Sequence, residues 1–217
     1  MDKLKFITIE GGDGAGKSTF IPVIKNYLES MGQEVILTRE PGGTALGEKL
    51  RDLLLTHKMD LTAETLLMFA ARAQHVNDVI EPALAQGKWV ICDRFTDSTY
   101  AYQCAGKGFP EGSLKHLENI VQGDLRPGIT FVFDVPLHVS KERLAKTGKI
   151  PDKFESEDDD FKERVNKGYK NLVKKELTRC KLIDSSQTIE DTKEQVLLHL
   201  QSFVHEFTSK SKKKIKP

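Results

Sequence analysis

The amino-acid sequence predicts an α/β fold, in which a parallel β-sheet is flanked by helices. Short apolar runs alternate along the 217 residues with longer segments whose apolar side chains repeat at helical spacing, an order typical of βαβ units. A glycine-rich stretch at 11–19 follows the first apolar run directly and fits a tight turn from a strand into a helix. With 38% apolar residues the chain can bury one sizeable core, so we expect a single domain over 1–208.

Five apolar runs are the candidate strands of this sheet. They lie at 4–10, 34–38, 88–93, 129–134 and 181–184. The stretches between them are long and mostly helical in character, as connections between parallel strands are. We therefore expect all five strands in one parallel sheet.

The helices are predicted from apolar stripes of helical spacing. The first follows Gly16 and ends near Met31, and Pro22 should loosen its second turn because proline lacks an N–H group. The second is expected over 62–85, with Thr62 as its N-cap. Further helices are predicted at 112–121, 137–146, 157–177 and 189–207.

Two irregular loops and a basic terminus interrupt this order. Loop 39–44 lies at the carboxyl end of the second strand, the edge at which open parallel sheets bind ligands. Loop 146–153 is rich in lysine and is either a lid over a phosphate site or a solvated surface loop. Residues 209–217 are expected to form a lysine-rich flexible tail rather than a nucleic-acid patch.

The charge balance argues against a protein that binds nucleic acid or membranes. The 33 basic and 32 acidic residues nearly cancel, so any polyanion must be bound locally. Cys92, Cys104 and Cys180 form no C-x-x-C pair, which favours reduced thiols over disulfides or zinc. The six histidines lack metal-ligand spacing. Neither a signal-peptide core nor a membrane-length apolar run is found, so we expect a cytoplasmic protein.

The stretch 11–19 has the residue types that bind a polyphosphate. It matches G-x-x-x-x-G-K-[ST] through Gly11, Gly12, Asp13, Gly14, Ala15, Gly16, Lys17, Ser18 and Thr19. Glycines let backbone N–H groups approach phosphates that a Cβ would obstruct. Lys17 brings a positive charge to the β- and γ-phosphates, and Ser18 offers a hydroxyl to Mg²⁺. This P-loop predicts binding of a nucleoside triphosphate at the start of a helix.

A second polar pair, Asp93 and Arg94, ends the third predicted strand. An acidic residue at this point would meet the Mg²⁺ of a P-loop enzyme. Arginine can hold a phosphate through two parallel hydrogen bonds, which a site for Mg²⁺ alone would not need. The alternative is an aspartate that caps a turn beside a surface arginine.

Four motifs in order, at 6–19, 38–44, 69–72 and 93–103, resemble thymidylate kinases of the bacterial kind. The resemblance extends from the first strand to the last helix. It implies the P-loop NTPase fold of nucleoside-monophosphate kinases, with a five-stranded parallel sheet flanked by helices and a short lid at about 146–156. It further implies a homodimer that transfers the γ-phosphoryl group of ATP to dTMP in line, with Mg²⁺, to give dTDP for dTTP synthesis.

The resemblance also implies an acceptor site. Its residues would be Asp13 at the 3′-hydroxyl, Arg39, Pro41, Arg51 and Arg94 around the phosphate, Tyr102 where a 2′-hydroxyl would have to fit, and Arg72, Thr99 and Gln103 at the pyrimidine. Arg72 would face O4 of thymine. Because arginine only donates hydrogen bonds, it suits that carbonyl and leaves the amino group of cytosine without an acceptor. Such a site should reject cytosine strongly.

The chain departs from the family where an aromatic ring covers the base. In the family, that ring usually lies four residues before the arginine that corresponds to Arg72. Met68 occupies this position here. Phe69 shares a helix face with Arg72 and is expected to cover the base instead. The alternative places Phe69 in the core and uses Met68 as an adaptable apolar floor.

A second departure concerns the catalytic cation. Some relatives carry an arginine at the position of Gly14, so this chain resembles the group that supplies the charge from the lid. That group's Asp-Arg pattern corresponds to Asp152 and Lys153, and we expect Lys153 to act with Lys17, Arg94 and Asp13. The alternatives in the lid are Lys146 and Lys149. Arg143 matches a family position near the adenine of ATP.

Two other functions remain open at this point. The same architecture could phosphorylate UMP or a deoxynucleoside. A GTP-dependent switch also uses a P-loop, but it reads guanine through Asn-Lys-x-Asp, and the nearest string, at 166–169, lacks the aspartate.

Overall fold

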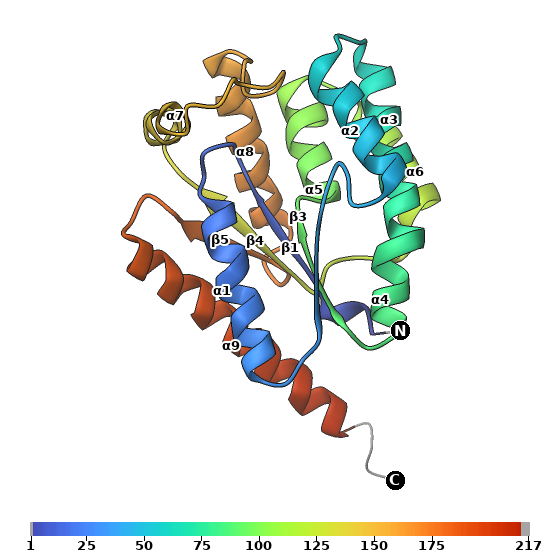
Figure 1. Cartoon of the computed structure of the whole chain (residues 1–217), viewed down its shortest axis with the longest axis vertical. Coiled ribbons are helices and arrows are strands. Elements are labelled where there is room, and N and C mark those ends of the chain that lie inside the picture. The colour runs from blue at the N-terminus through green and yellow to red at the C-terminus, as the bar shows by residue number, and fades with distance from the viewer. Residues whose placement is uncertain (1, 214–217) are drawn as a thin grey trace.

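A computed structural model describes residues 2–213 and shows a parallel sheet covered by helices on both faces (Figure 1). Its strands are β1 (Phe6–Gly11), β2 (Val35–Arg39), β3 (Trp89–Asp93), β4 (Ile129–Asp134) and β5 (Cys180–Asp184). They pair in the order β2-β3-β1-β4-β5, and every pair is parallel. The five-stranded parallel sheet that the sequence predicts is confirmed, and β4 has the predicted bounds.

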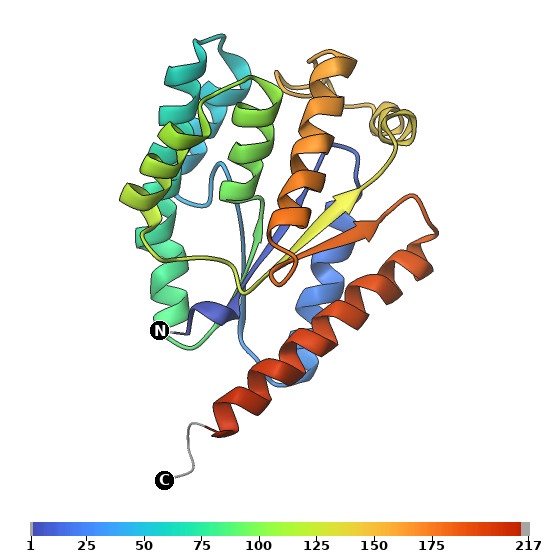
Figure 2. The same cartoon turned by 180° about the vertical axis from the view of Figure 1, so that it is seen from behind.

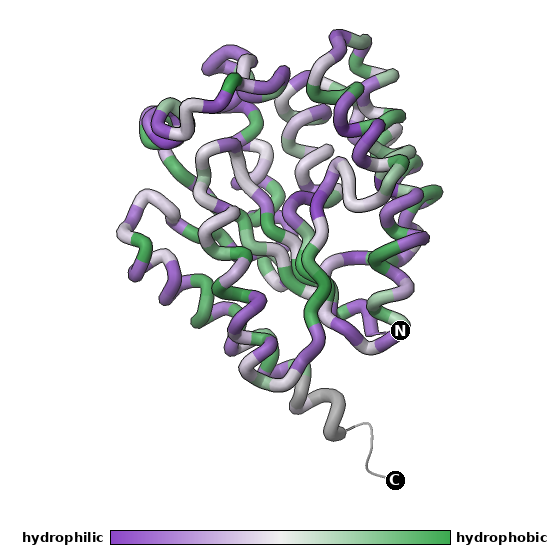
Figure 3. The backbone as a smooth tube through the Cα atoms, viewed as in Figure 1, coloured by the Kyte–Doolittle hydropathy of each residue, from purple (hydrophilic) through white to green (hydrophobic). Residues whose placement is uncertain are grey.

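The centre of the sheet is the most apolar part of the molecule. Every residue of β1 is buried, as expected for a strand covered on both faces. Ile7 lies between Ile91 of β3 and Ile129 of β4 in the register of the sheet. Figure 3 shows the hydrophobic stretches gathered on these inner strands, with hydrophilic stretches along the outer helices.

One face of the sheet packs against α1 (Lys17–Ser30) and α9 (Ile189–Lys213). Ile24 of α1 and Leu200 of α9 belong to the same core cluster as Ile9 and Phe131. α1 runs past Pro22 to Ser30 as one helix. α9 continues beyond the predicted end at residue 207 into the segment expected to be a flexible tail, of which 214–217 lie outside the described residues.

The opposite face is covered by a larger set of helices, which Figure 2 shows in front of the sheet. They include α3 (Leu61–His75), η2 (Val76–Ile80), α4 (Glu81–Ala85), α5 (Thr96–Thr99), η3 (Tyr100–Gly106) and α8 (Asp159–Lys175). η2 and α4 pack on Phe6 and Val90, and α8 packs on Val132. Outside this layer lie η1 (Lys3–Lys5), α2 (Ala45–Thr56), α6 (Glu111–Gln122) and α7 (Leu137–Lys146).

Several predicted helix boundaries are wrong. The expected helix over 62–85 is divided by the π-helical turn η2, and its N-cap is Asp60, whose carboxylate accepts hydrogen bonds from Thr62 N and Ala63 N. α2 was not predicted because its start lies in the irregular loop, where the Thr44 side chain caps it at Gly47 N. α8 begins after Asp158, which caps Phe161 N. No helix within 2–213 combines the length and apolar character that crossing a membrane requires.

Candidate active site

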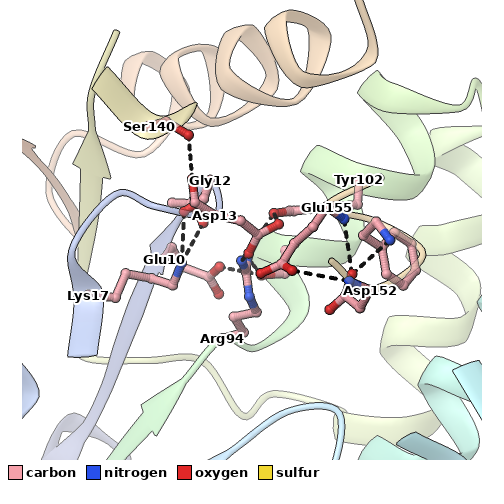
Figure 4. Close-up of polar contacts among 12 residues, drawn as sticks. Glu10, Gly12, Asp13, Lys17, Arg94, Tyr102, Ser140, Asp152 and Glu155 are labelled. Carbon is pink, nitrogen blue, oxygen red and sulfur yellow. Dashed lines mark hydrogen bonds and ion pairs between the residues drawn. The ribbon is translucent and has the colours of Figure 1, made fainter. Parts of the chain in front are cut away.

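The P-loop lies at the carboxyl edge of the sheet, where β1 ends and α1 begins. Two of its glycines have positive φ angles and no room for a side chain. A Cβ on Gly11 (φ 135°) would lie 2.4 Å from Phe133 O, and one on Gly14 (φ 75°) would lie 2.6 Å from Ser140 O. The Ser140 hydroxyl also donates to Asp13 O at 2.7 Å, which ties the loop to α7 (Figure 4).

Lys17 is folded back onto its own loop. Its Nζ donates to Gly11 O at 3.0 Å and to Gly12 O at 2.9 Å. Burial, reinforced by the nearby charge of Arg94, lowers the pKa of Lys17 to about 8. The side chain therefore lies close to the loop that would bind phosphates, and its hydrogen bonds go to carbonyls that a phosphate can replace.

The residues expected to hold Mg²⁺ fit a cation. Asp93 Oδ1 is buried and, among the described residues, has no hydrogen-bond partner. Ser18 and Asp93 line the same cavity. A carboxylate and a hydroxyl are oxygen donors of the kind Mg²⁺ prefers, and such an ion would satisfy the unpaired oxygen.

Arg94 follows the end of β3 and is the centre of a hydrogen-bond cluster. Its Nη2 donates to Asp13 Oδ1 at 2.5 Å and to the Tyr102 hydroxyl at 3.0 Å, and its Nη1 donates to the Tyr169 hydroxyl at 3.1 Å (Figure 4). The Tyr102 hydroxyl in turn donates to Asp13 Oδ2 at 3.0 Å. Asp13 is thereby fixed from two directions, and the P-loop is joined to η3 and α8.

The backbone of Arg94 is strained, with a φ of 69°. Such a conformation in a residue with a side chain costs about 1–3 kcal/mol and persists only where its surroundings enforce it. Here Arg94 N donates to Ile9 O at 2.9 Å, and the next amide, Phe95 N, donates to Glu10 Oε1 at 2.7 Å. The turn is therefore held against β1 on both sides of the strained residue.

Glu10 was not predicted as a site residue, although a carboxylate inside an apolar strand was a signal that could have found it. Its side chain is fully buried and accepts hydrogen bonds from Phe95 N, the Ser98 hydroxyl and the Tyr169 hydroxyl. Burial, reinforced by Asp97, raises the pKa of Glu10 to about 7. Tyr169 was also missed, because it lies far from every motif in the sequence.

Arg72 is fixed on three sides. Its Nε donates to Glu40 Oε2 at 2.7 Å, and its Nη2 donates to Thr99 Oγ1 at 3.0 Å. The guanidinium also lies over the rings of Phe69 and Phe95, at 4.8 and 5.3 Å from their centroids. Arg72 Nη1 is buried and has no partner among the described residues, so one donor remains for a ligand acceptor.

Most of these groups, though neither Glu10 nor Tyr169, line one cavity of about 580 Å³ at the carboxyl edge of the sheet. Its lining contains most of the predicted site residues: Asp13, Gly14, Gly16, Lys17, Ser18, Thr19, Arg39, Pro41, Arg51, Arg72, Asp93, Arg94, Thr99, Tyr102, Gln103 and Arg143. Arg51 Nη1 donates to Pro41 O at 2.9 Å, and the half-exposed Arg39 donates to Glu48 at 2.9 Å. A larger open groove of about 1350 Å³ lies beside it but contains no residue of the P-loop.

Five predicted residues are placed outside this lining: Gly11, Gly12, Ala15, Phe69 and Lys153. Gly11 and Gly12 contribute the carbonyls that hold Lys17. Ala15 is buried, and its carbonyl accepts from the Ser185 hydroxyl at 2.7 Å. Phe69 is the first correction: it packs in the core with Cys104 and Leu114.

Met68 lines the cavity in place of Phe69. A helix rotates by about 100° per residue, so a shift of one position carries the side chain from the cavity to the core. The structure therefore places Met68 in the cavity lining and Phe69 in the core, which favours the alternative interpretation of these two residues. Phe69 still contacts the site indirectly, since its ring packs on the Arg72 guanidinium.

The lid brings a second correction. Lys153, which was expected to face the phosphates, donates instead to Glu64 Oε2 at 2.6 Å and lies outside the cavity lining. Lys149 lines the cavity together with Arg143 and Thr147. Arg143 Nη2 donates to Ser185 O at 2.8 Å. Glu64 carries the negative charge that draws Lys153 away, and no motif in the sequence indicates that pairing.

Comparison with known proteins identifies the family. A family profile described as Thymidylate kinase matches residues 9–196. The chain is 50% identical over 199 residues to a thymidylate kinase of Methylobacillus flagellatus, covering 92% of this chain and 98% of that one. It is 50% identical over 192 residues to a thymidylate kinase of Bordetella pertussis, covering 88% and 92%.

A solved structure agrees with these relatives. The crystal structure of thymidylate kinase from Ehrlichia chaffeensis is 36% identical and superposes with a TM-score of 0.71, covering 90% of this chain and 97% of that one. Together, the profile, the relatives and the fold leave one assignment: the chain belongs to the thymidylate kinase family.

Proposed function

We propose that this protein transfers the γ-phosphoryl group of ATP to dTMP and forms dTDP, a step toward dTTP. The observation that carries the proposal is the single cavity lined both by the P-loop and by Arg94, Tyr102 and Arg72. A phosphoryl transfer needs its two substrates in one enclosed space with their phosphates adjacent. The names of the relatives support the same activity.

The acceptor is proposed to lie with its phosphate toward Arg94 and its base toward Arg72. Arg94, Arg39 and Arg51 line the cavity as charged donors for the phosphate. Asp13 would accept from the 3′-hydroxyl, while the Tyr102 ring would occupy the space of a 2′-hydroxyl. At the far end, Arg72 Nη1 would donate to O4 of thymine.

The donor is proposed to be ATP with Mg²⁺. The backbone of the P-loop and the start of α1 would hold its phosphates, and Arg143 would lie near the adenine. Ser18 and Asp93 would hold Mg²⁺, which would neutralise charge on the phosphates. Lys17 would leave the carbonyls of Gly11 and Gly12 for the β- and γ-phosphates.

The transfer is proposed to proceed in line, with positioning and charge supplying most of the catalysis. Arg94 and Lys17, which both line the cavity, would hold the two phosphates together. We assign the additional cation to Lys149, because it is the lid lysine that lines the cavity. Lysine supplies charge to the transferring group, but not the two-pronged clamp of an arginine.

A coupled assay of ADP release tests the function directly. ATP is supplied with dTMP, dUMP, UMP, dCMP or thymidine in turn, and we expect dTMP to give the highest kcat/KM. A preference for UMP would show that Tyr102 does not exclude the 2′-hydroxyl. Slow hydrolysis of GTP in preference to ATP, without transfer to any acceptor, would indicate a nucleotide-dependent switch instead.

We further propose that the protein acts as a homodimer in the cytoplasm. Support for the dimer comes from exposed apolar side chains on two neighbouring helices, Leu66 of α3 and Ile120 of α6, which are 49% and 79% exposed. The three cysteines are buried and unpaired, which suits a reducing compartment.

A further inference from the structure

Glu64 of α3 is a buried carboxylate that joins the substrate cavity to the lid. Its side chain is 1% exposed and accepts a hydrogen bond from Gln103 Nε2 of η3 at 2.9 Å. Lys107, just after η3, donates to both carboxylate oxygens at 3.0 Å. Lys153 of the lid donates to Oε2 at 2.6 Å. Two segments distant from α3 in the sequence, residues 103–107 and the lid, therefore converge on one charge.

This charge determines how the Gln103 amide is oriented. An ionised carboxylate can only accept hydrogen bonds, so the amide must turn its NH₂ group toward Glu64. The amide oxygen is then left for the cavity, which Gln103 lines. No residue among 2–213 is recorded as donating to that oxygen. The site consequently offers an acceptor from Gln103 beside the free donor of Arg72.

Two lysines keep Glu64 in the state that this orientation needs. Burial alone would raise the pKa of Glu64, but hydrogen bonds from Lys153, Gln103 and Lys107 lower it below its ordinary value. Lys107 is itself held in place, since its Nζ lies 4.7 Å from the centroid of the Phe154 ring and 3.3 Å from Glu157. The carboxylate is thus both ionised and fixed.

The residue that follows Lys153 in the lid also contacts the acceptor half of the cavity. Phe154 follows Lys153 in the lid, is buried, and packs edge-on against the Tyr102 ring with centroids 5.8 Å apart. The end of the lid is therefore anchored beside the proposed acceptor, whereas Lys149 earlier in the lid lines the cavity.

We propose that Glu64 is a positioning residue with two effects, one on the base and one on the lid. By orienting Gln103, it makes the site select a pyrimidine that carries hydrogen on N3, as thymine and uracil do and cytosine does not. By holding Lys153, it fixes the end of the lid. The inference rests on the proposed dTMP kinase activity, which it deepens.

The test compares wild type with Glu64→Gln in steady-state assays with ATP and either dTMP or dCMP. A glutamine can donate as well as accept, so Gln103 becomes free to turn its NH₂ group toward the cavity. We expect KM for dTMP to rise about tenfold and the ratio of kcat/KM for dTMP to that for dCMP to fall at least about tenfold. Glu157→Gln is the matched control, because Glu157 also pairs with Lys107 but is not recorded in contact with Gln103 or Lys153. It should change neither value more than about twofold.

Lys153→Met tests the lid separately. It removes the lid contact and leaves Gln103 paired with Glu64, so kcat should fall severalfold while the ratio between dTMP and dCMP is unchanged. This variant also carries the test of the effect on the lid if Glu64→Gln fails to fold in thermal denaturation. An unchanged kcat in Lys153→Met would overturn the proposed effect on the lid.

The remaining outcomes separate the inference from the function. A selective wild type together with an equally selective Glu64→Gln would overturn the inference alone. An equal loss of kcat/KM for both nucleotides would do so as well, because it would show a purely structural role. A wild-type enzyme without preference for dTMP would overturn the proposed function, and the inference with it.

Discussion

At the scale of single residues, the proposed role of Lys17 can be tested because its Nζ donates to two carbonyls of its own loop, Gly11 O and Gly12 O. Lys17→Ala removes the charge proposed to act on the β- and γ-phosphates and leaves a loop whose glycine geometry does not depend on it. We expect kcat/KM to fall at least about a thousandfold.

The control for this variant lies on the same helix. Lys25 is on the surface of α1 and pairs with Glu29, so Lys25→Ala should retain activity. Thermal denaturation should give similar Tm values for both variants. Activity near the wild-type level in Lys17→Ala would contradict the proposed role of the P-loop.

Glu10 makes the stability of the folded protein depend on pH. Because the pKa of Glu10 rises from 4.5 to about 7, the folded state binds more protons than the unfolded state between these values. Glu10 therefore stabilises the folded state by up to about 3 kcal/mol below pH 4.5. This contribution to the free energy of unfolding is lost as the pH rises through 7.

Glu10→Gln removes this titration. Urea unfolding at pH 5 and at pH 8 should show the variant gaining stability relative to wild type at the higher pH. Its lost hydrogen bonds contribute the same cost at both values, so the difference between the two pH values isolates the titration. A difference between the proteins that does not change with pH would show that Glu10 titrates normally.

The predicted site residues that the structure brings together are those whose position follows from local spacing. Asp13, Lys17 and Arg94 lie where β1 and β3 end, and parallel strands bring these ends together at one edge. Phe69 lies in the core because one position along a helix changes the face that a side chain occupies. The contact of Lys153 with Glu64 could not be predicted, because Glu64 lies 89 positions earlier in the chain and the periodicity of a sequence does not indicate such a pair.

At the scale of elements, α8 and η3 pack so closely that glycine is required between them. A Cβ on Gly168 of α8 would lie 2.7 Å from Ala105 Cβ and 3.2 Å from Ala101 Cα. Gly168→Ala should therefore push α8 away from η3 and destabilise the protein by about 1–3 kcal/mol. Because Tyr169 contacts Arg94, activity should fall as well.

Gly112 provides the comparison for this substitution. It lies in α6, where a Cβ would meet no atom within 4 Å. Gly112→Ala should stabilise the helix by about 0.5–1 kcal/mol. If urea unfolding gave the two alanine variants the same stability, the close packing at Gly168 would have no energetic consequence.

The lid makes a separate prediction at this scale. Lys149 lines the cavity, whereas Lys146 is exposed and lies outside its lining. Lys149→Met should lower kcat about a hundredfold with little change in KM for dTMP, since the charge acts on the transferring group. Lys146→Met should stay within about threefold of wild type. Equal losses in both variants would indicate a diffuse positive charge instead of one catalytic cation.

Two of the elements that the sequence failed to predict share one property. η2 and η3 are π-helical turns, which are rare and frequently occur at functional sites. η3 carries Tyr102 and Gln103 into the cavity, and its geometry depends on the packing of α8 rather than on its own apolar spacing. Local propensity identifies strands and long helices but not these turns.

At the scale of the whole molecule, the proposed dimer can be tested by placing a charged side chain on the surface expected to form the interface. Leu66 of α3 is 49% exposed, and Leu198 of α9 is 64% exposed. We expect sedimentation velocity to show a dimer for wild type, monomers for Leu66→Glu, and a dimer for Leu198→Glu. A wild-type monomer would contradict the proposal. Dissociation by Leu198→Glu, but not by Leu66→Glu, would indicate that the interface lies on α9.

The order of the strands also determines how the chain can fold as it is synthesised. β1 is the first strand made and the most deeply buried, yet its two neighbours are β3 and β4. An emerging chain must therefore carry its central strand without partners until residue 89 and then residue 129 have left the ribosome. Contacts of such long sequence separation slow folding and leave an apolar strand open to aggregation. The strand that supports the P-loop is thus the one most in need of protection during translation.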